Sequence, residues 1–108
     1  MKLHKLTDMI RGWLVGAISP TVYYTDVCEI AIKKYVKNDF EAKHHHKIAT
    51  EITVIIFGKV KMNGVEYGPD DIITIEPNES TNFLAMEDTV TCCIKIPGAL
   101  NDKYLDET

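Results

Sequence analysis

The sequence predicts an all-β domain, either a sandwich or a barrel, and three features support this fold class. Short runs rich in β-branched and aromatic residues recur along the chain, with turn residues between them. Asn63-Gly64 stands between Val-Lys-Met and Val-Glu-Tyr, which is the strongest hairpin signal in the sequence. Helical periodicity is almost absent. We therefore expect about eight or nine short strands and less than about one-fifth helix.

The expected strands can be placed in chain order. Residues 1–11 fit either one helical turn or an edge strand, and Ser19-Pro20 ends the apolar segment 12–18. The turn at 37–39 contains Asn38, which tolerates a left-handed backbone, and Gly58 permits a tight reversal. We expect the polar tail to pack on the outside or to fray. The other expected strands are 21–25, 27–36, the two around the bend that follows the histidines, 59–62, 65–67, 71–75, 81–85 and 89–96.

The length and charge of the chain restrict its class. Its 108 residues are enough for a single domain, residues 1–108, with a core over about residues 27–97. The net charge is -4 and no stripe of Lys and Arg is present, so nucleic acid and anionic membranes are poor partners. No apolar run approaches the roughly 18 residues of a membrane helix. The first residues also lack a signal-peptide pattern.

Three cysteines are present, and they predict free thiols in a reducing cytoplasm. No Cys-x-x-Cys spacing occurs, so zinc-knuckle and redox motifs are absent. Cys92 and Cys93 are neighbours, whose side chains leave a strand on opposite faces and rarely form a disulfide. Alternation groups Cys92 with Val90, Ile94 and Ile96, and we expect this face to point to the core.

The stretch from His44 to Gly58 holds three of the four histidines, a glutamate and an apolar run. On an extended strand His44 and His46 point to one side, while His45 points to the other. Glu51 opens the next expected strand, so a bend between Lys47 and Thr50 lets it face the same interior. Two imidazoles and one carboxylate form the metal site of many iron and manganese proteins.

This stretch resembles the first motif of the cupin superfamily, whose members are small double-stranded β-helix barrels, or jelly rolls. That motif has a glycine, His-x-His, a glutamate and a second glycine at fixed spacing. His44-His45-His46, Glu51 and Gly58 match it with four intervening residues before the glutamate, and Asn38 replaces the leading glycine. The resemblance implies a divalent metal on His44, His46 and Glu51, with iron, manganese, nickel and zinc as candidates.

A second stretch resembles the second cupin motif but departs from it. Asp70-Asp71, Glu76-Pro77-Asn78 and Thr81 align with that motif without a gap. Asp70 stands in place of a glycine, and Thr81 stands where the third metal histidine belongs. A shift of one residue would put Asn82 there, and neither residue is a strong ligand. The resemblance spans about residues 33–97.

The chain is also similar to short bacterial and phage cupins described as sugar-epimerase-like. Trp13-Leu14-Val15-Gly16 and the run from Lys95 to Tyr104 carry this similarity. It implies that the protein binds, isomerises or epimerises a small polar ligand such as a sugar or sugar phosphate. Two alternatives are a metal-dependent dioxygenase and a non-enzymatic metabolite-binding module. Candidate pocket-wall residues are Thr81, Asn82, Tyr35 and Lys34, together with Lys33 and Lys95; no general base and no catalytic residue can be assigned.

The segment 12–25 is apolar and aromatic and precedes the strands that carry the site. A short domain covers only part of its own apolar surface, and exposed patches usually mark an interface. We therefore expect a homodimer in which this segment packs on, or exchanges strands with, the partner. The alternative is a monomer in which the segment folds over its own barrel.

Overall fold

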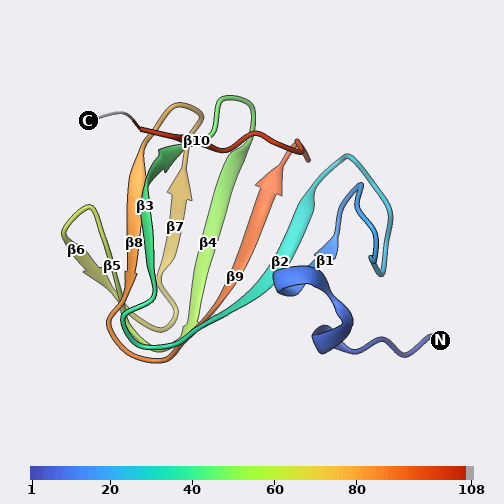
Figure 1. The fold of residues 1–108 in the computed structure, drawn as a ribbon, viewed down its shortest axis with the longest axis horizontal. Coiled ribbons are helices and arrows are strands. Elements are labelled where there is room, and N and C mark those ends of the chain that lie inside the picture. Colours follow the sequence, from blue (N-terminus) through green and yellow to red (C-terminus); the bar gives the residue numbers. More distant parts are fainter. Residues whose placement is uncertain (107–108) are drawn as a thin grey trace.

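The computed structural model describes residues 1–106 and is built almost entirely from strands, which confirms the all-β prediction (Figure 1). Two 3₁₀ helices, η1 (Leu6–Asp8) and η2 (Ile10–Gly12), precede the first strand. Neither of them is long and apolar enough to cross a membrane, and residues 1–106 contain no other helix. The strands are β1 (Trp13–Val15), β2 (Glu29–Tyr35), β3 (Phe40–His45), β4 (Thr50–Phe57), β5 (Val60–Met62), β6 (Val65–Tyr67), β7 (Ile72–Ile75), β8 (Thr81–Ala85), β9 (Thr89–Ile96) and β10 (Tyr104–Leu105).

The strands form two five-stranded sheets with the layout of a jelly roll. One sheet has the order β1-β2-β9-β4-β7 and the other has the order β10-β3-β8-β5-β6. All pairings between named strands are antiparallel. The apolar core lies between the sheets, since both contribute to it: Ile55 and Ile75 from the first, and Val60, Met62, Phe83 and Ala85 from the second.

The turns use the residues that the sequence indicated. Asn63 and Gly64 have φ of 48° and 81° and join β5 to β6 in the predicted hairpin. Asn38 has φ of 77° in the turn between β2 and β3. Gly58 has φ of 92°, and a Cβ there would lie 2.4 Å from the Asp88 carbonyl oxygen. Glycine is thus required at position 58 for both conformation and space.

The region before β2 differs from the prediction. Residues 21–25 do not form a strand and make only a single bridge, between Val15 and Tyr23. The Thr21 hydroxyl donates a hydrogen bond to the Leu14 carbonyl at 2.9 Å, which holds the segment as a loop beside β1. β1 pairs with β2 of its own chain and forms the edge of the first sheet.

The inward face of β9 is the opposite of the predicted one. Thr89, Thr91 and Cys93 are buried, whereas Cys92 is only partly buried. Thr91, Cys93 and Lys95 line an interior pocket. The expectation that Cys92 faces the core was therefore wrong. The more hydrophobic face of β9 was expected to point inward, but this part of the barrel interior is polar.

The C-terminal segment is held in place rather than frayed. It runs across the ends of several strands (Figure 1), and its β10 pairs with β3 opposite His44 and His45. The Asp102 side chain is 4% exposed, and its carboxylate accepts hydrogen bonds at 3.0 Å from the backbone amides of Lys47, Ile48 and Ala49. These amides belong to the loop that joins His46 to β4. Residues 107–108 of the predicted tail lie outside the described residues.

We predict that Gly58→Ala lowers the free energy of unfolding by about 2 to 4 kcal/mol, because it adds both a strained φ and a collision with backbone. Gly64→Ala is the matched control, since φ there is also positive but nothing lies within 4 Å of its Cβ. The control should lose only about 1 kcal/mol. Urea unfolding of both variants measures the difference, and equal losses would contradict the close approach at Gly58.

We predict that Asp102→Asn lowers the free energy of unfolding by about 2 kcal/mol at neutral pH. Burial by itself would raise the pKa of Asp102, but the amides of Ala49, Lys47 and Ile48 and the nearby His46 outweigh it and lower the pKa. Because the folded pKa is the lower one, this stabilisation is present above the unfolded pKa and is lost as pH falls through the folded pKa. Urea unfolding at a series of pH values should show the two proteins converging in acid. A constant difference at all pH values would contradict the role of the charge.

Candidate functional site

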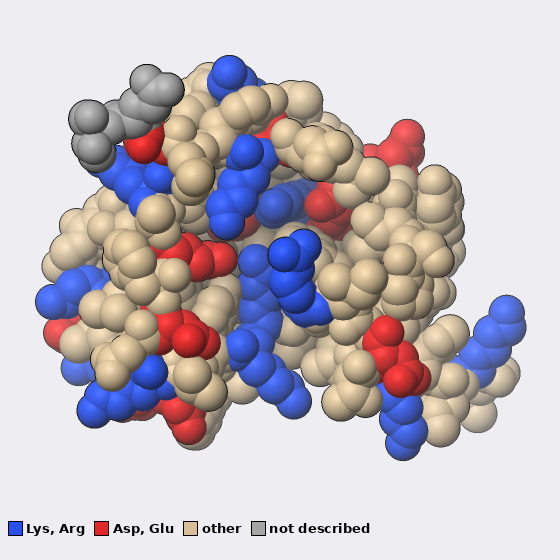
Figure 2. Space-filling model, viewed as in Figure 1, with Lys and Arg blue, Asp and Glu red and all other residues tan. Residues whose placement is uncertain are grey.

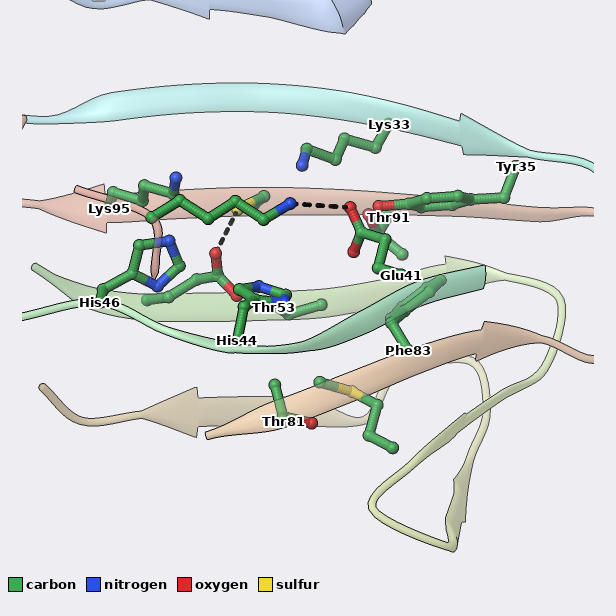
Figure 3. A pocket seen from close by; sticks show the side chains of 14 residues that line it. Lys33, Tyr35, Glu41, His44, His46, Thr53, Thr81, Phe83, Thr91 and Lys95 are labelled. Carbon is green, nitrogen blue, oxygen red and sulfur yellow. Dashed lines mark hydrogen bonds and ion pairs between the residues drawn. The ribbon is translucent and has the colours of Figure 1, made fainter. Parts of the chain in front are cut away.

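A pocket between the two sheets collects most of the residues that the sequence singled out (Figure 3). Its enclosed volume is about 40 Å³, which is room for an ion, a few waters or one small chemical group. Polar side chains from both sheets and from the C-terminal segment converge on it. The lining residues are Lys33, Tyr35, Glu41, His44, His46, Glu51, Thr53, Met62, Thr81, Phe83, Thr91, Cys93, Lys95 and Lys103.

The three consecutive histidines divide as strand alternation predicts. His44 and His46 are 7% and 4% exposed and line the pocket, with ring centres 5.6 Å apart. His45 does not line it; its Nδ1 lies 2.7 Å from the Asp106 carboxylate, and its ring stacks on Tyr104. The C-terminal segment therefore binds the outward-facing His45, while His44 and His46 face the pocket.

A hydrogen bond to the backbone fixes which ring nitrogen of His44 carries the proton. Its Nδ1 lies 2.9 Å from the Ala42 carbonyl oxygen, which can only accept, so Nδ1 carries a proton and donates. In the neutral imidazole this arrangement leaves Nε2 with a free lone pair. The same arrangement, with one ring nitrogen donating to a carbonyl, orients histidines that bind metals.

His46 has the one unsatisfied buried polar atom among the side chains of residues 1–106. Its Nε2 is buried and has no hydrogen-bond partner. Burial lowers the pKa of His46, and the positive charge of Lys95 lowers it further. Neutral imidazole is thus favoured. A buried nitrogen without a partner costs about 1 to 3 kcal/mol, so this site favours a bound group that satisfies it.

Glu51 reaches the pocket from β4 but is already hydrogen-bonded there. Its carboxylate accepts from the Thr53 hydroxyl at 3.3 Å and from the Cys93 thiol at 3.4 Å. Burial raises the pKa of Cys93, and the negative charge of Glu51 raises it further, so the thiol keeps its proton. Sequence reasoning missed Cys93 and Thr53, because both contribute to the pocket only once the inward face of each strand is known.

The histidines and Glu51 share one pocket without forming a compact ligand set. Within residues 1–106, no three His, Cys, Asp or Glu side chains are grouped closely enough to hold a metal ion. The structure therefore brings the predicted residues into one place, and the predicted metal remains a proposal.

The predicted wall residues divide between the pocket and its surroundings. Thr81 pairs with His44 across β8 and β3 and lines the pocket, at the position where the cupin motif has a histidine. Tyr35 also lines it and packs against Phe83 with the rings tilted and their centres 4.6 Å apart. Burial raises the pKa of the Tyr35 hydroxyl, and the negative charge of Glu41 raises it further. Asn82 does not line it, since its side chain accepts from the Asn63 amide at 2.7 Å.

A wider groove of about 1020 Å³ borders the pocket. The N-terminal segment forms one wall of it, including η2, Trp13 and residues 17–20, and the C-terminal segment forms another. Lys33, Lys95 and Lys103 line both the groove and the pocket. Lys34 is exposed and lines the wider groove but not the inner pocket.

Comparison with known proteins identifies the fold. No protein-family model matches the chain, and no curated protein does either. An uncharacterized conserved protein with a double-stranded β-helix domain from Klebsiella pneumoniae has a TM-score of 0.72 and 17% identity, covering 99% of this chain and 93% of that one. A cupin-2 domain containing protein from Shewanella frigidimarina has a TM-score of 0.59 and 12% identity, covering 67% and 72%.

A third solved structure of this kind is the DMSP lyase DddQ from Ruegeria pomeroyi, with a TM-score of 0.68, 18% identity, and coverage of 86% of this chain and 49% of that one. Identities this low establish shape rather than activity. The similarity to sugar-epimerase-like cupins finds no support among these comparisons. The chain is thus a double-stranded β-helix protein with the cupin fold.

Proposed function

We propose that this protein is a cytoplasmic, metal-binding cupin that binds a small polar ligand in its barrel and isomerises or epimerises it. The observation that carries the proposal is the His46 Nε2 atom, which is buried in the pocket without a partner. A buried, neutral imidazole with a free nitrogen is what a divalent metal takes as a ligand. The three free cysteines fit a reducing compartment.

The other donors of the pocket suit a metal in their chemistry, and their side chains would have to move closer together to form a ligand set. His44 would contribute Nε2, because its Nδ1 proton is held by the Ala42 carbonyl. Glu51 would contribute a carboxylate oxygen, exchanging its hydrogen bonds from Thr53 and Cys93 for the ion. Two imidazoles and one carboxylate suit iron, manganese, nickel or zinc, and they leave positions open for a ligand. When bound, such an ion polarises a carbonyl or hydroxyl group as a Lewis acid.

The protein's own side chains would orient the ligand by hydrogen bonds. The Tyr35 hydroxyl keeps its proton, because burial raises its pKa, so it can donate to a ligand oxygen. Thr91 adds a hydroxyl from β9 on the same wall. The Thr81 hydroxyl is already committed to the Asn82 carbonyl at 2.7 Å, so it shapes the pocket more than it binds. The DMSP lyase of the same fold supports small-molecule chemistry in such a barrel.

Two alternatives use the same residues differently. An oxygenase would hold iron on the triad and consume oxygen. A non-enzymatic binding module would hold a ligand without turnover, with Thr81 in the place of a histidine marking the lost chemistry. Oxygen uptake by the iron-loaded protein would favour the first, and solvent-proton exchange on a sugar would favour the isomerase. Tight ligand binding with neither reaction would favour the module.

We predict that His44→Ala removes most of the metal that copurifies with the untagged protein, while His45→Ala retains it. His44 faces the pocket, whereas His45 is bound to Asp106 outside it. Losing one ligand should weaken metal affinity by about tenfold or more. Elemental analysis of protein purified without added metal measures the content. Equal loss in the two variants would mean that the histidine run binds metal without the pocket.

We also propose that two copies associate through the outer face of the β1-β2-β9-β4-β7 sheet. Cross-strand rows on this face are mostly apolar: Ile30, Ile94 and Ile52 are paired in one row that ends at Thr74, and Ile32, Cys92, Val54 and Ile72 are paired in the next. Ile72 is 66% exposed and Ile56 is 49% exposed. A closed twofold dimer would cover such a face. The segment 12–25 joins this interface through β1, the edge strand of the same sheet.

We predict a mass of two chains by light scattering at micromolar concentration. Ile72→Glu should give a monomer, because it puts a charge on the apolar face. Val65→Glu is the control, since Val65 is 52% exposed but lies on β6 of the other sheet. A monomer mass for the unmodified protein would overturn the proposal. A monomer from Val65→Glu together with a dimer from Ile72→Glu would show that the interface lies on the other sheet.

A further inference from the structure

Two lysines approach the same tryptophan at the mouth of the pocket. The Nζ atom of Lys33 lies 5.2 Å from the centre of the Trp13 ring, and that of Lys95 lies 5.0 Å from it. The three residues come from neighbouring strands, β2, β9 and β1. Figure 3 shows both lysines extending into the pocket, Lys95 near His46 and Lys33 above Glu41. Two positive charges thus share one aromatic neighbour, and one of them, Lys95, lies beside the unsatisfied histidine.

Neither ammonium group has an ion-pair partner among the described residues. Within residues 1–106, Lys33 and Lys95 form no ion pair, whereas Lys103 pairs with Glu41 at 3.9 Å. Figure 2 shows Lys and Arg side chains in the hollow on this face, with acidic side chains beside them, in a chain whose net charge is -4. Concentrating like charges is unfavourable unless an anion joins them. Two lysines without an ion-pair partner thus stand together in a protein whose net charge is negative.

The carboxylates near the groove already have partners. Those of Glu29 and Asp39 accept hydrogen bonds from the backbone amides of Ala99 at 2.6 Å and Val36 at 2.9 Å. The carboxylate of Asp102 accepts from the loop after His46. Glu41 is the partner of Lys103. Glu29 and Glu51 lie opposite Lys95 on the neighbouring strands, and Glu51 accepts hydrogen bonds from Thr53 and Cys93. Within residues 1–106 no carboxylate forms an ion pair with either lysine, so both ammonium groups can bind an external anion.

We infer that Lys33, Lys95 and Trp13 form a binding subsite for an oxyanion group, a carboxylate or a phosphate, at one end of the ligand. The ammonium groups would make charge-assisted hydrogen bonds to its oxygens, and the indole would pack against the adjacent carbon skeleton. The subsite deepens the proposed function, because it defines the ligand as a small organic acid whose polar end reaches toward His46.

The two volumes agree with this division of the ligand. The inner pocket, at about 40 Å³, admits only a small group, while the bordering groove, at about 1020 Å³, admits a whole metabolite. Lys33 and Lys95 line both spaces, so they stand at the junction between them. An acid bound there keeps its bulk in the groove and directs its anionic end toward the inner pocket.

The test uses Trp13 as its own reporter, because it is the only tryptophan in the chain. Fluorescence excited at the red edge of tyrosine absorption then reports the surroundings of Trp13, without signal from other tryptophans. The probes are glucose, glucose 6-phosphate and glucuronate, so that the neutral sugar is compared with phosphate and carboxylate forms. We expect saturable changes with one or both acids and none with glucose. Affinity for the acid should fall as salt is added, because the contact is ionic.

Lys33→Met and Lys95→Met should each weaken acid binding by about tenfold or more. Lys37→Met is the matched control, since Lys37 is exposed in the turn after β2 and lines neither space, and its binding should match the unmodified protein. Should the pocket variants fail to fold, the salt dependence of the unmodified protein decides. Equal responses to glucose and to the acids, no response to either acid, or equal loss in the control would overturn the inference.

Metal content, measured on the same samples, separates this inference from the proposed function. Acid binding at Trp13 without any metal would support the subsite and contradict the metal site. A full metal content without acid binding would contradict the subsite alone.

Discussion

The hydrogen bonds of Asp102 hold together the part of the chain on which the site depends. His46 precedes the loop 47–49 and Glu51 follows it, and three amides of that loop bind the one carboxylate. The loop is fixed from the other side by the Asn78 amide, which donates to the His46 carbonyl at 2.7 Å. A loop without these partners would leave three buried or half-buried amides unpaired and the two site residues free to separate. A distant C-terminal residue thus positions residues that lie close together in sequence.

The interior of the barrel is polar at the end that holds the site, and this links the site to the proposed dimer. At the end that holds the site, the strands of the first sheet direct polar groups inward, including Thr53, Thr91 and Lys95. Their apolar partners in the alternation, such as Ile94 and Ile52, are therefore directed outward. Successive side chains of a strand point to opposite faces of the sheet, so the choice of residues that face inward also decides which residues face outward. A polar interior that suits a ligand thus creates an apolar exterior that suits a second copy.

Sequence reasoning predicted the fold and the parity of the histidines, since both depend on local signals. Turn residues such as Asn63-Gly64 and strand alternation at His44–His46 act over a few positions. The inward face of β9 was predicted wrongly, because the prediction turned its more hydrophobic face, with Cys92, toward the core. The pocket at this end of the barrel is polar, so the other face, with Thr91 and Cys93, points inward. Sequence reasoning also missed Asp102, whose partners are more than 50 residues away in sequence. The similarity of the segment after Lys95 to short cupins carried no indication that this segment clamps the histidine loop.

The central claim is that the inward histidines share a metal while the outward one does not. Titration of the ¹⁵N-labelled protein with zinc, followed through the imidazole nitrogens by NMR, tests it most directly. The account predicts that the Nε2 signals of His44 and His46 shift together and saturate at one equivalent, with His45 unchanged. A shift of His45 alongside them, or saturation without any change at His46, would contradict it.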